Sequence, residues 1–148
     1  MCFGKSIERI AKQMEKGSRV VAVDWPYTGG YGNAPEPEPV LRETMRCISM
    51  DGYDVNLFIG DSHKPALVEA VSKLGPFDFC FIDGDHSYEG AKADWENYGA
   101  ISRIVAFHDI INNPDCFRLW QEIKTGGYRT VEYTQSTWLG IGVVFRDN

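Results

Sequence analysis

Short apolar runs that end in acidic residues alternate with helical patterns along most of this chain. The runs are "RVVAVD" at 19–24, "DVNLFIGDSH" at 54–63, "FDFCFID" at 77–83 and "RIVAFHD" at 103–109. Their apolar parts lack the polar alternation of a strand with one wet face, which is typical of strands buried in a parallel sheet. Strands that alternate with helices favour right-handed crossovers, so the sequence predicts an α/β fold with an open sheet covered on both faces.

Helix signals fill the segments between these runs. Apolar residues recur at helical spacing from Ile7 to Met14, and Gly17 provides a stop signal. Asn113 and Pro114 give a later helix its capping residue and a first-turn proline. Further helices are expected over about 40–50, 65–75, 88–98 and 115–124, and strands over about 129–134 and 139–145 complete the chain.

The segment from Trp25 to Pro39, "WPYTGGYGNAPEPEP", has neither a helical nor a strand period. A loop of that length inside a small domain is usually functional or mobile. We therefore predict a lid loop over 25–39, with disorder as the alternative.

The composition limits the number of domains and the classes of partner. At 148 residues and 43% hydrophobic content, residues 1–148 are predicted to form a single domain. The net charge of -6 and the scattered basic residues argue against nucleic acid or an anionic membrane surface as a partner. No apolar stretch reaches the roughly 20 residues that span a bilayer. Four cysteines without a C-x-x-C pair fit a reduced, cytoplasmic protein.

Polar side chains that can bind metals or move protons gather at the predicted strand ends. The set comprises all three histidines and five aspartates: His63, His86, His108, Asp24, Asp61, Asp83, Asp85 and Asp109. In open α/β sheets, ligands bind in the crevice outside the carboxyl ends of the strands. The distribution therefore predicts a functional site at this edge of the sheet, although a single such residue would more often cap a helix or face solvent.

Asp83, His108 and Asp109 end two strands that we expect to be neighbours, so their side chains can surround one divalent cation. Carboxylates suit Mg2+, Mn2+ or Ca2+, while an imidazole favours Mn2+, Fe2+ or Zn2+. His86 lies three residues beyond Asp83 and is expected to face the ligand as a general base. Asp24, at the end of the first strand, is suited to ribose hydroxyls.

Five segments together resemble the class I S-adenosylmethionine-dependent methyltransferases, in particular their metal-dependent small-molecule O-methyltransferase branch. The segments are "FGKS", "VVAVD", "LFIGDSH", "FDFCFIDGDHSYEGAKADWENYGA" and "IVAFHD". The resemblance implies a Rossmann-like, mostly parallel sheet with an antiparallel C-terminal strand, S-adenosylmethionine as cofactor, a divalent metal such as Mg2+ or Mn2+, and a small-molecule acceptor.

Carried over by position, the resemblance gives each candidate residue a role. For the donor it implies Gly4 and Ser6 at the methionine end, Asp24 on the ribose, Asp61 and Ser62 near the adenine, and Asp85 at its border. For the reaction it implies Asp83, His108 and Asp109 as metal ligands and His86 as the base. Many relatives have an Asp-Asn pair where this chain has His108 and Asp109.

The resemblance also predicts a chain without its first strand. In the family a strand precedes the glycine loop and lies at the centre of the sheet, whereas this sequence starts inside that loop. We expect a gap between the strands at 20–24 and 78–83, and unpaired edges are costly unless something fills them. The neighbouring strands could close up, a homodimer could cover the exposed edge, or the sequence could be an N-terminally truncated form of a longer protein.

Two alternative functions stay open at this point. A methyltransferase-like remnant that has lost donor binding would act as an interaction or dimerisation module. A metal-dependent phosphoesterase would also use Asp/His clusters such as "GDSH" and "DGDH", but it leaves Asp24 and "FGKS" without a role.

Overall fold

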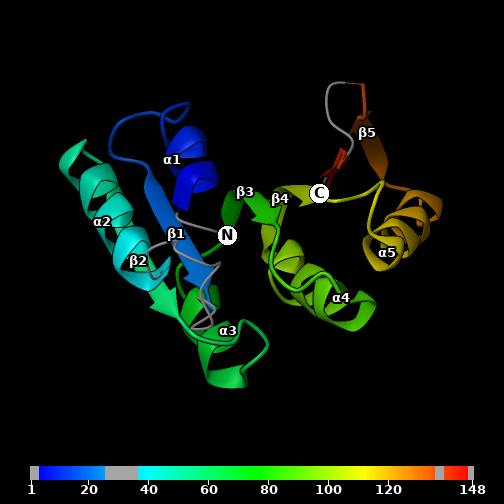
Figure 1. Ribbon diagram of the computed structural model, residues 1–148, viewed down its shortest axis with the longest axis horizontal. Helices are drawn as coiled ribbons and strands as arrows, with labels where there is room; N and C mark the ends of the chain where they lie inside the picture. Colours follow the sequence, from blue (N-terminus) through cyan, green and yellow to red (C-terminus); the bar gives the residue numbers. More distant parts are fainter. Residues whose placement is uncertain (1–3, 26–36, 136–138, 147–148) are drawn as a thin grey trace. The chain divides into compact units, whose positions relative to one another are not determined.

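The computed structural model describes residues 4–25, 37–135 and 139–146 (Figure 1). Most of the predicted lid loop, residues 26–36, lies outside the described residues. The chain divides into two compact units, Met1–Leu67 and Val68–Asn148. The predicted single domain over 1–148 stays a prediction.

The first unit pairs two parallel strands and packs helices beside them. Its elements are α1 (Lys5–Ala11), β1 (Arg19–Asp24), α2 (Pro37–Met50) and β2 (Asp54–Ile59). The register runs from Arg19 opposite Asp54 to Asp24 opposite Ile59, so both strands end together. The buried core consists of Ile7, Ala11, Val20, Ala22, Leu41, Met45, Ile48 and Tyr53. Burial of these apolar side chains is the main force that holds the two helices against the sheet.

Helix α1 is shorter than the sequence predicts. Its pattern of apolar residues continues to Met14, but the helix ends at Ala11. Gln13 and Met14 donate their backbone N–H groups to carbonyls three residues earlier, which is the tighter turn that often closes a helix. The stop at Gly17, which has a φ of 86°, therefore follows a turn rather than the helix itself.

The second unit contains a four-stranded mixed sheet. After α3 (Pro65–Ser72), which begins in the first unit, its elements are β3 (Phe77–Ile82), α4 (Tyr88–Asn97), the short 3-10 helix η2 (Gly99–Ile101), β4 (Ser102–His108), α5 (Pro114–Thr125), β5 (Arg129–Tyr133) and β6 (Ile141–Phe145). The strand order is β3-β4-β6-β5, with β3 and β4 parallel and β6 antiparallel to both neighbours. This arrangement confirms the predicted α/β class and the antiparallel C-terminal strand.

Helices α4 and α5 cover one face of this sheet. Trp120 of α5 is 1% exposed and packs in a core with Val105 of β4 and Val144 of β6. A Cβ atom at Gly142 would lie 2.7 Å from the Trp120 indole, so glycine is what allows the ring to lie on β6. Asn113 caps α5 as predicted, and its side chain accepts hydrogen bonds from the N–H groups of Asp115 and Cys116.

The described strands form two sheets, where the sequence predicts one open sheet with a gap between the strands at 20–24 and 78–83. Among the described residues, β1 pairs only with β2, and β3 pairs only with β4. No pairing in the described part of the chain joins the strands at 20–24 and 78–83, and the loss of a central strand stays a prediction. Within the described residues, β1 and β3 therefore each pair along one edge only.

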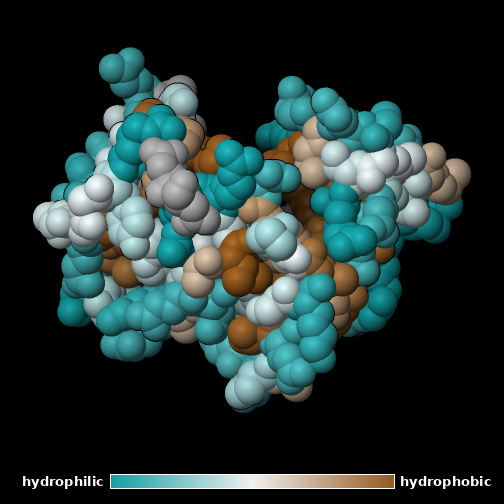
Figure 2. Space-filling view, turned by 180° about the vertical axis from the view of Figure 1, so that it is seen from behind, coloured by the Kyte–Doolittle hydropathy of each residue, from teal (hydrophilic) through white to brown (hydrophobic). Residues whose placement is uncertain are grey.

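Some apolar side chains remain on the surface. Figure 2 shows hydrophobic patches within a surface that is largely hydrophilic. Phe79 of β3 is 41% exposed and Phe117 of α5 is 46% exposed. In the part of the chain that the structure describes, no helix has both the length and the apolar character to cross a membrane.

Candidate functional site

The ends of β3 and β4 place acidic and imidazole side chains next to one another. Ile82 pairs with Phe107 as the last partners of this parallel ladder, and the next step of the same register sets Asp83 beside His108. Paired residues of neighbouring strands point to the same face of a sheet. Asp109 follows with a φ of 59°, a left-handed conformation that aspartate tolerates better than most residues.

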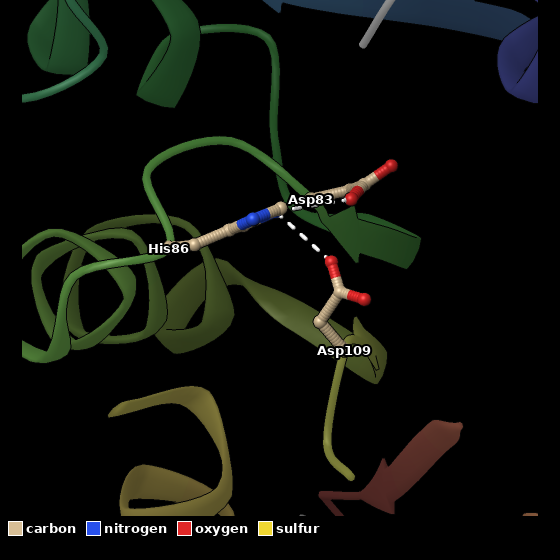
Figure 3. Close-up of side chains that lie close together, drawn as sticks. All are labelled: Asp83, His86 and Asp109. Carbon is tan, nitrogen blue, oxygen red and sulfur yellow. Dashed lines mark hydrogen bonds and ion pairs between the residues drawn. The ribbon is translucent and has the colours of Figure 1, made fainter. Parts of the chain in front are cut away.

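Four polar atoms form a closed ring of contacts at this edge. His108 Nδ1 lies 3.2 Å from Asp83 Oδ1 and 3.1 Å from Asp109 Oδ2. His86 Nε2 lies 3.4 Å from the same oxygen of Asp83 and 3.3 Å from the same oxygen of Asp109. Figure 3 shows Asp83, His86 and Asp109 converging from the end of β3, the following loop and the end of β4. We call Asp83, His86, His108 and Asp109 the Asp/His cluster.

The Asp/His cluster is buried to different depths. The side chains of Asp109 and Asp83 are 12% and 18% exposed, that of His108 is 26% exposed and that of His86 is 42% exposed. His108 Nδ1 is itself buried and has no hydrogen-bond partner although it faces two carboxylates. A buried polar atom without a hydrogen bond is costly, and a cation held by both carboxylates and this nitrogen would satisfy it.

The ligand atoms of the Asp/His cluster lie close enough together to hold a metal ion. Asp83, His86 and Asp109 each offer one ligand atom, and these atoms lie within 4.8 Å of one another. The structure thus brings together the predicted ligands Asp83, His108 and Asp109, and it places the predicted base His86 against two of them. Their roles stay predictions.

The loop after β3 is held by contacts that the sequence does not reveal. Asp85 Oδ1 accepts a hydrogen bond from the N–H of Ser87, and Ser87 Oγ accepts one from the N–H of Gly90 at the start of α4. A Cβ atom at Gly90 would lie 2.3 Å from Cγ of Asp85, so only glycine allows this close approach. Asp85 therefore supports the loop that carries His86, and its predicted place beside the adenine stays a prediction.

Cys116 contacts the backbone of His86, and the sequence did not predict this contact. Its thiol donates to the backbone carbonyl of His86 across 3.7 Å. Burial, together with the nearby carboxylates of Asp109 and Asp115, raises the pKa of Cys116 to about 11. The thiol is therefore protonated near neutral pH, which fits a structural contact and not a thiolate ligand or nucleophile. No short-range pattern marks it, because its partner is distant in the sequence.

The other predicted donor residues lie in the first unit. Gly4 is the residue before α1 and has a φ of 70°, and a Cβ atom there would lie 2.9 Å from Cγ2 of Thr44. Ser6 lies in the first turn of α1. Glycine at position 4 is thus required by both its backbone conformation and its packing against α2.

Asp24, Asp61 and Ser62 gather at the carboxyl ends of β1 and β2. The N–H of Gly60 donates to the carbonyl of Asp24, which ties the two strand ends together. Asp61 Oδ1 accepts a hydrogen bond from the N–H of His63, and this bond is the main reason why the pKa of Asp61 is lowered. Asp61 is therefore ionised at neutral pH. Neighbouring acids at parallel strand ends are suitably placed for a nucleoside.

Comparison with known families decides the class of the protein. A family model described as "Methyltransferase domain" matches residues 1–110, which is most of the chain. The chain belongs to this methyltransferase family. No curated protein matches the sequence of the methyltransferase at a significant level.

Solved structures share the fold of this methyltransferase at low sequence identity. The apo form of CalS11, a TDP-rhamnose 3'-O-methyltransferase of calicheamicin biosynthesis, has a TM-score of 0.71 at 15% identity and covers 99% of this chain and 69% of its own. The MycE methyltransferase of mycinamycin biosynthesis, in complex with Mg and S-adenosylhomocysteine (SAH), has a TM-score of 0.53 at 13% identity. That match covers 97% of this chain and 49% of MycE, so the chain spans about half the length of MycE.

The family match confirms the predicted resemblance to methyltransferases, and the solved structures share the fold of two O-methyltransferases. They give no support to the phosphoesterase alternative.

Proposed function

We propose that this methyltransferase transfers the methyl group of S-adenosylmethionine to a hydroxyl group of a small-molecule acceptor, with a divalent metal ion at the Asp/His cluster. The observation that carries the proposal is the ring of contacts that joins two carboxylates and two imidazoles. The fold likeness supports it, because one neighbour is a TDP-rhamnose 3'-O-methyltransferase and another was solved with Mg and SAH.

Asp83, His108 and Asp109 are the proposed metal ligands. They are the three least exposed side chains of the cluster, and their ligand atoms face one another. When bound, the ion would supply a Lewis acid that positions the acceptor hydroxyl and lowers its pKa. The two carboxylates bring the negative charge that holds a divalent cation, and burial strengthens this attraction.

His86 is the proposed general base. Its imidazole is the most exposed of the four side chains, so an acceptor can reach it, and Asp83 and Asp109 orient its Nε2 atom. An imidazole accepts protons near neutral pH. His86 would take the proton of the acceptor hydroxyl while the oxygen forms its bond to the methyl carbon and the carbon–sulfur bond of the donor breaks, which leaves SAH.

The residues proposed to bind S-adenosylmethionine belong to the first unit, apart from Asp85, which is proposed at the border of the adenine. Asp24 is proposed to bind the ribose hydroxyls, because a carboxylate at a strand end accepts both hydrogen bonds of a vicinal diol. Asp61 and Ser62 follow the neighbouring strand and are proposed near the adenine. Gly4 and Ser6, at the start of α1, are proposed near the methionine end.

Titration of the purified chain with SAH by calorimetry, with and without Mn2+, tests the donor part of the proposal. Micromolar affinity, about -8 kcal/mol, would support it. A transfer assay with radiolabelled S-adenosylmethionine then tests the reaction, with TDP-rhamnose and mycinamycin VI as the first acceptors. A folded chain that binds neither SAH nor metal would instead support the non-catalytic remnant.

A further inference from the structure

We infer that the Asp/His cluster selects a first-row transition-metal ion, such as Mn2+ or Co2+, over Mg2+, and that His108 is the residue that sets this preference. The inference rests on the proposed metal site and adds the class of ion to it. Mg2+ takes oxygen ligands and keeps several waters, whereas imidazole nitrogen favours transition-metal ions.

The fold fixes the His108 nitrogen in the ligand position. His108 is the last residue of β4, and its backbone is paired with Ile141 of β6. The ring of Phe81 lies edge-on to the imidazole, with the ring centroids 6.1 Å apart. The backbone pairing holds His108 at the end of β4, the ring of Phe81 packs against the imidazole, and its Nδ1 atom faces the two carboxylates.

The distances around His108 fit a shared ion. Two ligand atoms bound at about 2.0–2.2 Å to one ion lie about 2.8–3.6 Å apart for bond angles between octahedral and tetrahedral values. The Nδ1 atom of His108 lies 3.2 Å from Asp83 Oδ1 and 3.1 Å from Asp109 Oδ2. The nitrogen is also buried and lacks a hydrogen bond.

Calorimetric titration of the wild-type chain with MnCl2, CoCl2 and MgCl2, without donor or acceptor, tests the inference. We expect Co2+ and Mn2+ to bind at least about tenfold more tightly than Mg2+. In His108→Asn, where an amide replaces the imidazole, we expect the ratio of Co2+ to Mg2+ affinity to fall by about tenfold. His63→Asn is the matched control: the His63 ring pairs with Asp61, which is not a member of the Asp/His cluster, so the ratio should stay unchanged.

His108→Asp separates a ligand role from a structural role. In His108→Asp, a third carboxylate should keep or improve Mg2+ binding, so the ratio of Co2+ to Mg2+ affinity should fall below that of wild type. Structural damage would instead weaken the binding of both ions equally. Circular dichroism establishes that each variant is folded. The visible absorption bands of bound Co2+ should differ between the wild-type chain and the His108 variants.

Three results would overturn the inference: Mg2+ binding as tight as Co2+ in wild type, an unchanged ratio in His108→Asn, or no metal binding at all. The last result would also remove the metal from the proposed function. SAH binding, measured separately, would then still report on the methyltransferase assignment.

Discussion

Asp83 Oδ1 lies 3.2 Å from His108 Nδ1, although the two residues end different strands. Asp83→Asn should therefore lower Mn2+ affinity at least about tenfold, because it removes one of the two carboxylate charges that face the ion site. Calorimetry measures the change. Asp78→Asn, on the same strand but with a side chain that is 93% exposed, is the matched control, and equal loss in both variants would contradict the metal assignment.

His86→Ala should abolish methyl transfer while SAH binding changes little. The imidazole is the most exposed member of the cluster, and its proposed task is to accept the acceptor proton, a contribution worth typically 10^2 to 10^4 in rate. Single-turnover transfer and SAH calorimetry on the same preparation measure the two effects. A variant that loses its fold would show His86 to be a structural residue instead.

Gly90→Ala should destabilise the second unit and move the loop that carries His86. The added Cβ atom would meet Asp85 at 2.3 Å, and such overpacking costs about 1–3 kcal/mol. Urea unfolding measures the loss. The double variant Asp85→Gly/Gly90→Ala removes the clash, so its loss should be smaller than the sum of the two single losses; simple additivity would argue against the contact.

The sequence predicted the bounds of β1 and β3 well because a polar residue follows the buried part of each strand. Asp83, His108 and Asp109 could be predicted as a group for the same reason, since neighbouring parallel strands end at one edge. The contact of His86 with both carboxylates could not be predicted from the sequence, because it depends on the Asp85–Ser87 hydrogen bond and on the thiol of Cys116. These contacts follow no period.

The end of α1 was missed for a related reason. Helical periodicity reports which face of a segment is apolar, and the residues up to Met14 keep that pattern. The backbone nevertheless closes in tighter turns after Ala11, which leave the apolar spacing nearly unchanged. Likewise, the apolar runs identify strands but neither their partners nor their burial, since β2 has no fully buried residue and β3 has only one.

Stability should fall in acid partly through Glu132. The carboxylate accepts hydrogen bonds from Lys124 and Trp120, and the bond from Lys124 is the main cause that lowers the pKa of Glu132 below its ordinary value of 4.5. A pKa that is lower in the folded state stabilises the fold above the unfolded value, and this contribution is lost as pH falls through the folded value.

Glu132→Gln tests this dependence. The amide oxygen can still accept from Trp120 but cannot form the ion pair with Lys124, so wild type should be more stable at pH 7 and the difference should shrink below about pH 4.5. Thermal unfolding across pH 3–7 measures it. Glu96→Gln, which loses only a weak 3.9 Å pair with Lys92, is the control, and a difference that stays constant with pH would rule out the linkage.

Asp24→Asn should weaken SAH binding by about tenfold or more, because a hydrogen bond to a charged group contributes about 1.5–3 kcal/mol. The same change should leave Mn2+ affinity unaltered, since the proposed metal ligands are Asp83, His108 and Asp109. Asp51→Asn, in the exposed turn after α2, controls for the loss of one negative charge. If both variants bind SAH as tightly as wild type, the ribose is held elsewhere, and the strand-end position of Asp24 has only a structural meaning.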